Sequence, residues 1–164
     1  MSSKQISIRD TYDFHGTDDV IPDSSDSKLR VTVIYTSTEG TRAALRTAGA
    51  LAKDLETRLA IEVPVAVSLR FSLEIPQVSI DFLERRLIRL VAESGIDTDE
   101  VKVQIRLCRD RKKCLQQILV PGSLIVIGGK ERWWFQEERR LERFLRKLGY
   151  QVMFVTTNAK GRSN

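Results

Sequence analysis

The sequence predicts an α/β fold: a doubly wound, five-stranded parallel sheet with helices on both faces. Two observations predict it. Runs of β-branched and apolar residues alternate, from a first strand to a fifth, with segments whose apolar residues recur at helical spacing. The connections between these segments are short, as they are between strands and crossover helices in parallel sheets. The length of 164 residues is that of one domain.

The first strand and the first helix follow one another directly. Residues 29–35 are a β-branched run that predicts a strand. Small apolar residues over 43–55 recur at helical spacing and predict a helix packed closely against the sheet. We expect Thr38 or Thr41 to cap this helix, because an N-cap hydroxyl accepts a hydrogen bond from an amide of the first turn.

The second strand and helix follow at residues 59–67 and 80–91. Pro64 lies inside the strand and removes a donor from the ladder, so it predicts a bulge or an end of pairing. The helix has one apolar face and is expected to end at Gly95, since glycine readily adopts the left-handed conformation of a helix terminus.

The second half of the chain repeats the alternation. Strands are predicted over 101–107, 123–127 and 151–155, and helices over 110–120 and 134–148. The first of these strands alternates apolar and charged residues, as a half-exposed strand does. The second is apolar throughout, which is typical of a strand covered on both faces.

Charge is distributed unevenly along the chain. Residues 1–27 are rich in Asp and Ser and predict a flexible acidic leader, followed by the folded domain (28–158) and a C-terminal tail (159–164). The net charge is +5, and residues 1–28 contribute −3, so the remainder carries +8. A basic domain admits an anionic ligand or nucleic acid as a partner. The lack of a long apolar run or a secretory signal predicts a cytoplasmic protein.

The sequence contains no complete set of catalytic residues. His15 is its single histidine, which disfavours Ser-His-Asp triads, Cys-His pairs and most catalytic zinc sites. Cys108 and Cys114 match neither a zinc-binding spacing nor the CxxC of redox enzymes, so we expect buried or partly buried thiols and no metal site. A binding module is therefore favoured over an enzyme.

Ligands of open parallel sheets bind beyond the carboxyl ends of the strands, where the strand order reverses. The hydroxyl-rich turn at 36–41 can hold a phosphate at a helix N-terminus, or can be an ordinary capped turn. Gly128-Gly129-Lys130 allows a ligand to approach the backbone, or is a turn that requires a positive φ. The candidate ligand-binding residues are Tyr35, Thr36, Ser37, Thr38, Val67, Gly128, Gly129 and Lys130.

Three segments resemble the universal stress protein family, in register over residues 29–157. Val33-Ile-Tyr-Thr-Ser-Thr-Glu-Gly-Thr-Arg-Ala-Ala-Leu45 is similar to the first strand and helix of a typical member, which read Val-Asp-Gly-Ser and then Ser-x-x-Ala-Leu. Ser123-Leu-Ile-Val-Ile-Gly128 is similar to the fourth strand, Asp-Leu-Ile-Val-Met-Gly. Tyr150-Gln-Val-Met-Phe-Val155 is similar to the last strand. The resemblance implies the fold shared with adenine nucleotide alpha hydrolases.

Members that bind ATP share a glycine signature after the fourth strand: G-x-x-G, nine residues, then G-[ST]. Gly128 matches the first glycine, but Glu131 stands at the second, and no Gly-Ser or Gly-Thr pair follows before Gly149. Thr36 stands where the first strand of the family ends in an acidic residue. The resemblance therefore implies that conventional ATP binding is absent. No cofactor is predicted, and an unidentified anion or nucleotide remains the candidate ligand.

Two further clusters are candidates for contact with partners. The aromatic cluster Trp133-Trp134-Phe135 replaces the lost glycine loop, and either plugs the vacated pocket or presents an apolar surface to a protein partner. The basic cluster of the predicted third helix has little acidic compensation and predicts an anion-attracting patch. It comprises Arg109, Arg111, Lys112 and Lys113.

Three functions remain open. The resemblance implies a regulatory module of the stress response that forms homodimers through the last strand, at Val152, Met153, Phe154 and Val155; an exposed apolar edge strand also favours pairing. The alternative is a flavodoxin-like FMN protein, whose phosphate loop resembles residues 37–41. The other alternative is a nucleic-acid-associated accessory protein, for which the basic charge is an argument but no recognised motif is present.

Overall fold

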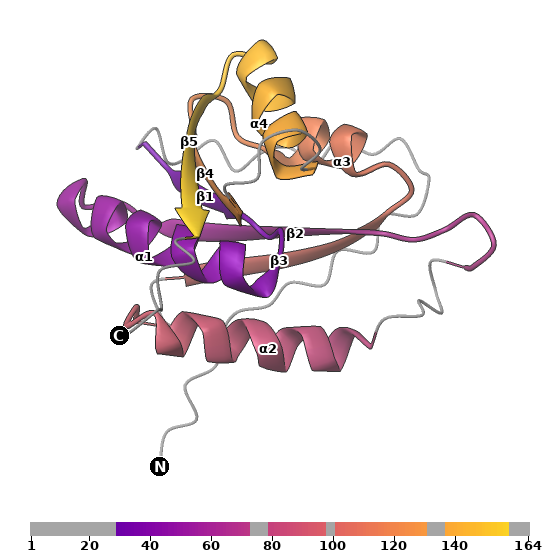
Figure 1. Ribbon diagram of the computed structural model, residues 1–164, viewed down its shortest axis with the longest axis horizontal. Helices are drawn as coiled ribbons and strands as arrows, with labels where there is room; N and C mark the ends of the chain where they lie inside the picture. Colours follow the sequence, from indigo (N-terminus) through magenta and orange to yellow (C-terminus); the bar gives the residue numbers. More distant parts are fainter. Residues whose placement is uncertain (1–28, 73–78, 98–100, 131–136, 158–164) are drawn as a thin grey trace, which may run out of the picture.

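The computed structural model describes residues 29–72, 79–97, 101–130 and 137–157. Its five strands form one parallel sheet in the order β3-β2-β1-β4-β5. The strands are β1 (Val31–Ile34), β2 (Leu59–Ala66), β3 (Val101–Cys108), β4 (Leu124–Lys130) and β5 (Gln151–Thr157). The helices are α1 (Thr38–Asp54), α2 (Ile80–Glu93), α3 (Arg111–Ile118) and α4 (Glu137–Lys147). The predicted element order and the doubly wound fold are confirmed (Figure 1).

Two hydrophobic layers hold the helices against the sheet. On one face, alternate residues of β1 such as Val31 and Val33 pack with Ala44 of α1 and Leu87 of α2, all fully buried. On the other face, Ile34 of β1 belongs to a separate cluster that contains residues of β4, α3 and α4. The strand period of two therefore sends neighbouring side chains of β1 into different layers. Figure 1 shows α1 and α2 on one side of the sheet and α3 and α4 on the other.

The first helix, α1, is capped by Ser37 and not by the expected Thr38 or Thr41. Ser37 is the N-cap of α1, and its hydroxyl accepts a hydrogen bond of 3.1 Å from the Gly40 amide. The other expected candidates have different roles. Thr38 is the first helical residue, and Thr41 Oγ1 accepts from the Thr36 amide instead.

Pro64 lies in β2 without a bulge. The pairing of β2 with β3 continues through the Pro64–Arg106 pair, whereas the pairing of β1 with β2 ends at the Ile34–Glu62 pair. The Glu62 carbonyl faces β1, because it accepts from the Tyr35 amide. Since backbone groups two residues apart point to the same side of a strand, the missing N–H of Pro64 also faces that side, beyond the end of β1. No ladder hydrogen bond is lost there.

Several predictions fall outside the described residues: the leader (1–27), the tail (159–164), the aromatic cluster at 133–135 and the first residues of the helix predicted from 134. The described part of that helix is α4, which begins at Glu137. None of the helices described is both long enough and apolar enough to span a membrane.

Candidate ligand site at the carboxyl ends of β1 and β4

The reversal of strand order lies between β1 and β4. These neighbouring parallel strands lead to helices on opposite faces, α1 after β1 and α4 after β4. Their carboxyl ends therefore form the crevice where doubly wound sheets bind ligands. The sequence-predicted residues meet here: Thr36 Oγ1 donates a hydrogen bond of 2.7 Å to the Gly128 carbonyl. This bond joins two segments separated by 92 positions in the sequence.

The hydroxyl groups of the turn after β1 are bound within the protein. Thr36 Oγ1 donates to Gly128, and Thr41 Oγ1 accepts from the Thr36 amide at 3.1 Å. Ser37 Oγ accepts from the Gly40 amide as the helix cap. Three hydroxyls that could bind a phosphate therefore stabilise the turn and fasten it to β4.

The backbones of Gly40 and Gly128 lie in direct contact. A Cβ added to either glycine would overlap with the backbone carbonyl of the other. Neither glycine has a positive φ. Gly128 and Gly129 lie inside β4, so these two residues do not form the turn with positive φ that was one of the two expectations for them. The glycines are required by close packing of the first turn of α1 on β4. The α1 side of the crevice is thus filled by the chain itself.

Gly129 is covered by a side chain from the next strand. A Cβ at this position would lie 2.9 Å from Phe154 Cζ and 3.2 Å from the Glu138 side chain. The Arg139 guanidinium lies 3.7 Å from the centre of the Phe154 ring on β5. A cation over an aromatic ring at this distance is a favourable contact. Phe154 is thereby held between β4 and α4.

Arg111 is the cation that reaches the crevice. It is the first residue of α3, and its Nη2 donates to the Tyr35 carbonyl at 2.5 Å, at the carboxyl end of β1. Its Nε is buried and has no hydrogen-bond partner among the described residues. Glu137 lies 4.0 Å from its Nη1 but is largely exposed, which makes this ion pair weak. Arg111 therefore places a partly exposed positive charge beside the Tyr35 carbonyl.

The remaining members of the predicted basic patch have separate environments. Arg109 Nη1 donates to the carbonyls of Val67, Ser68 and Phe71 and so holds the segment that follows β2. Lys112 Nζ lies 5.3 Å from the centre of the Phe144 ring of α4. Lys113 is exposed on α3, and Lys130 is exposed at the end of β4. The patch is therefore divided. Arg111 is its member at the β1–β4 crevice, where Lys130, one of the predicted ligand-binding residues, also lies.

No family model and no curated protein matches this chain. Solved structures do match. They include a universal stress protein in complex with cAMP (15% identity, TM-score 0.54, covering 81% of this chain and 100% of that chain). The universal stress protein UspA from Lactobacillus plantarum matches at 15% identity and a TM-score of 0.55, over 79% of this chain and 99% of that chain. A universal stress protein from Archaeoglobus fulgidus matches at 14% identity and a TM-score of 0.52, over 78% and 93%.

The chain has the universal stress protein fold. The shared fold agrees with the resemblance detected in the sequence segments. The strand order also distinguishes this chain from flavodoxins. Their order is 2-1-3-4-5, whereas the order here is 3-2-1-4-5. The fold therefore provides no support for the FMN alternative.

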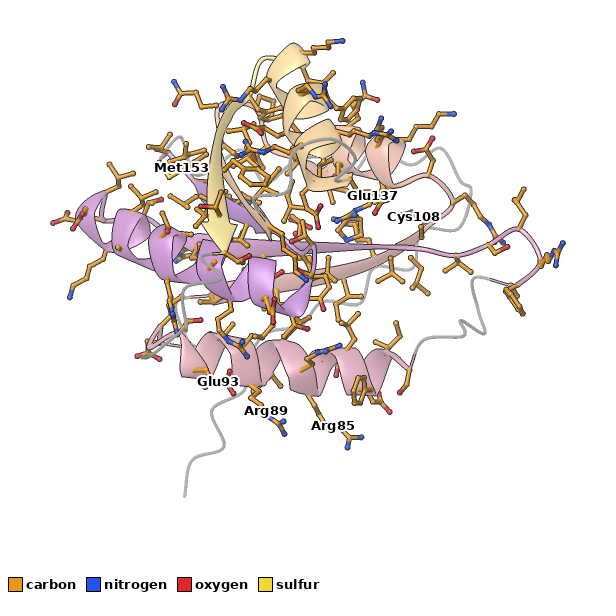
Figure 2. All side chains as sticks on the ribbon, viewed as in Figure 1. Arg85, Arg89, Glu93, Cys108, Glu137 and Met153 are labelled. Carbon is orange, nitrogen blue, oxygen red and sulfur yellow. The ribbon has the colours of Figure 1, made fainter. Side chains whose placement is uncertain are left out.

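The predicted dimer strand is an edge of the sheet. β5 pairs with β4, and no described strand pairs with its other side. Met153 is 38% exposed, whereas Val152 is buried against α3 and α4; Figure 2 labels Met153 on β5. Arg146 Nη2 donates to the Val152 carbonyl at 2.9 Å. A strand added to this edge would therefore pair beyond Val152.

A buried carboxyl lies on the α3 side of the sheet. Glu62 of β2 is 4% exposed, and its Oε2 has no hydrogen-bond partner among the described residues. Burial raises the pKa of Glu62 to about 7, against the lowering effects of Arg106, Lys102 and Arg30. Glu62 therefore changes charge close to neutral pH. The described residues contain no cluster of three or more His, Cys, Asp or Glu side chains suited to a metal ion.

Sequence reasoning missed three features of this region. It placed Arg111 in a surface patch, although its contact with Tyr35 puts it in the crevice. It did not pair Gly40 with Gly128 or detect the burial of Glu62. The signal for Glu62 was present, since a glutamate between Ile61 and Val63 inside an apolar strand is unusual. The other two features depend on contacts between distant segments.

Proposed function

We propose that this domain is a homodimeric regulatory module of the universal stress type that binds an anion or a nucleotide without the triphosphate loop of ATP-binding members. The contact between Gly40 and Gly128 carries this proposal. A polyphosphate bound over β1 and β4 needs free backbone amides and space around them. Here α1 rests directly on Gly128, and Phe154 covers Gly129. The sequence also lacks the remaining glycines of the signature, so we infer that ATP is neither bound conventionally nor hydrolysed.

A ligand with one phosphate fits the remaining chemistry better than ATP does. The cation in the crevice is Arg111, whose side chain is 27% exposed and can donate to a phosphate oxygen. Lys130 is exposed nearby, at the end of β4. One of the similar structures is a complex with cAMP, a nucleotide with a single phosphate. We therefore propose nucleoside monophosphates, cyclic or linear, as the ligand class.

Thermal denaturation with added ligands tests this proposal, because a ligand that binds the native state raises the melting temperature. We expect AMP or cAMP to raise the melting temperature and Mg-ATP to raise it no more than inorganic phosphate does. Arg111→Gln should abolish the effect of the monophosphates. Arg89→Gln, on the exposed side of α2, is the matched control and should retain it. A larger stabilisation by Mg-ATP than by the monophosphates would contradict the proposal.

Dimerisation through β5 is supported by the character of this edge. An unpaired apolar edge strand is prone to aggregation, and pairing with a second copy removes the exposed edge. Met153 and Val155 are incompletely buried. Because Arg146 already binds the Val152 carbonyl, we expect the two copies to meet over residues 153–157.

Light scattering coupled to size exclusion tests the dimer. The natural sequence should have the mass of two chains at micromolar concentration. Met153→Lys should yield monomers, since a charge at the centre of the edge opposes pairing. Phe82→Lys, which also places a charge at an exposed apolar residue but on α2, should stay dimeric. Monomeric natural protein, or a dimer unaffected by Met153→Lys, would contradict an interface at β5.

Nucleic-acid binding is a second candidate because of one surface feature. Figure 2 shows Arg85 and Arg89 extending away from α2. Phe82, on the same helix, is 62% exposed, with the Arg86 guanidinium 5.9 Å from its ring centre. Exposed rings beside cations are a feature of surfaces that bind single-stranded nucleic acid. If this candidate is right, a labelled oligonucleotide should bind in low salt, bind less in high salt, and lose affinity with Phe82→Ala.

A further inference from the structure

The two cysteines of the chain lie on either side of the two-residue connection between β3 and α3. Cys108 is the last residue of β3, and Cys114 is in the second turn of α3. Their thiols are close enough to interact, and each changes the pKa of the other. Cys108 Sγ lies 3.6 Å from the Val65 carbonyl, to which its proton is donated. Cys108 therefore donates to the backbone of β2.

The two thiols differ in exposure and in acidity. Cys108 is partly exposed and Cys114 is buried; Figure 2 labels Cys108 at the end of β3. The Cys114 thiol lowers the pKa of Cys108, aided by the Arg111 guanidinium and opposed by burial and by Asp110. The Cys108 thiol and burial raise the pKa of Cys114. The accessible thiol is therefore also the one that forms the thiolate more readily, as an oxidant-reactive cysteine requires.

We propose that Cys108 and Cys114 are a redox modification site at which hydrogen peroxide or an organic hydroperoxide converts the two thiols into an intrachain disulfide. The inference goes beyond ligand binding at the crevice and does not depend on it. Accessible thiolates beside a second cysteine are the usual arrangement of reversible thiol oxidation. The second thiol lies on the next element and interacts with the first, so the disulfide can form without a search by a distant segment.

The reaction proceeds in two steps. The Cys108 thiolate attacks one oxygen of hydrogen peroxide, the O–O bond breaks, and the departing hydroxide takes up a proton to become water. Cys108 is then a sulfenic acid. The Cys114 sulfur attacks the Cys108 sulfur, the S–O bond breaks, and the oxygen leaves as water with the proton of Cys114. Two thiols are oxidised by two electrons, and one peroxide is reduced to two waters.

The disulfide would act on the candidate ligand site through α3. Arg111 lies midway between the two cysteines in the sequence and binds the Tyr35 carbonyl from the first turn of this helix. Asp110, between Cys108 and Arg111, caps the same turn by accepting from the amides of Lys112 and Lys113. A covalent link from β3 to α3 therefore spans the turn that positions Arg111.

The test uses the full chain, reduced and then exposed to hydrogen peroxide, with no nucleotide present. The intact mass should fall by two hydrogen atoms, and the protein should remain a single chain on a non-reducing denaturing gel. Trypsin cleaves after basic residues and so separates the two cysteines. Arg106 precedes Cys108, Arg109 and Lys113 lie between the cysteines, and Lys130 is the next basic residue after Cys114. Without reductant, peptides 107–109 and 114–130 should therefore be recovered joined, and reductant should release them.

Two variants identify the order of attack. Cys114→Ala should stop at a sulfenic acid on Cys108, which a dimedone probe labels. Cys108→Ser should react with peroxide much more slowly than the natural sequence. Three results would overturn the proposal. They are disulfides between two chains, oxidation of Cys108 to sulfinic acid without a disulfide, and labelling of Cys114 in place of Cys108. Because the linked peptides are measured on the natural sequence, the test does not depend on the stability of either variant.

Discussion

At the residue scale, two glycines determine how the carboxyl end of the sheet is built. Gly40 in the first turn of α1 and Gly128 in β4 touch through their backbones, and Thr36 Oγ1 adds a hydrogen bond to the same carbonyl of Gly128. A sequence pattern can single out Gly128, because it follows an apolar strand. It cannot show that the group approaching the glycine is the chain itself and not a ligand.

Gly128→Ala should destabilise the protein strongly. The added methyl group would overlap with the Gly40 carbonyl, and the backbone of α1 or β4 must shift to admit it. We expect a loss of about 3 kcal/mol in the free energy of unfolding, measured by urea denaturation. Gly49→Ala is the control, because its methyl group meets the flexible end of the Ile96 side chain and alanine favours a helix. Equal losses for both variants would contradict the close contact of the two backbones.

Glu62→Gln should change the pH dependence of stability. The pKa of Glu62 is raised in the folded protein to about 7, above its ordinary value of 4.5. The protonated carboxyl therefore contributes stability that is fully present below pH 4.5 and is lost as the pH rises to about 7. The difference amounts to about 3 kcal/mol.

Comparing Glu62→Gln with the natural sequence by urea denaturation at several pH values isolates this contribution. The glutamine variant does not ionise, so it should gain stability relative to the natural sequence as the pH rises from 5 to 8, with the gain levelling off above about pH 7. A difference between the two proteins that stays constant over this range would mean that Glu62 has an ordinary pKa.

At the element scale, α3 depends on its cap more than the longer helices do. It has 8 residues, a length at which an isolated helix is not stable in water. The Asp110 carboxylate accepts from the amides of Lys112 and Lys113 and so satisfies two donors of the first turn. The basic residues of this helix, read alone, predicted a binding patch, whereas Arg111 binds the backbone at the end of β1 and Lys112 lies against Phe144.

Asp110→Ala should cost about 1 kcal/mol in the free energy of unfolding. Asp110→Asn should retain most of that stability, because an asparagine side chain is also a good N-cap acceptor. Chemical denaturation followed by circular dichroism measures both. A loss for the asparagine variant as large as that for the alanine variant would indicate that the charge of Asp110, not its cap hydrogen bonds, is what matters.

Element types were predictable because each apolar pattern is long enough to show its period. The β-branched run before Thr36 is typical of a strand, whereas the apolar residues of the alanine-rich segment after it recur at helical spacing. Element ends depended on single contacts and were less predictable. The cap at Ser37 and the continuous pairing at Pro64 follow from where β1 stops, which no local pattern encodes.

At the scale of the whole molecule, the alternation of elements predicts a parallel sheet but not the order of its strands. That order, β3-β2-β1-β4-β5, places the carboxyl ends of β1 and β4 side by side and leaves β5 at an edge. The family resemblance implied the type of fold, and the strand order itself comes from the structure. The crevice is formed by segments far apart in the sequence, so its occupation by Gly40, Thr36 and Phe154 required the three-dimensional structure.

A titration of isotope-labelled protein with Mg-ATP, followed by the amide signals of Gly40, Gly128 and Gly129, examines that occupation most directly. If the first turn of α1 and the Phe154 ring fill the space over β4, these amide signals should show no saturable change up to millimolar Mg-ATP. Saturable shifts at all three glycines, with affinity retained in Arg111→Gln, would mean that the crevice opens to receive a polyphosphate.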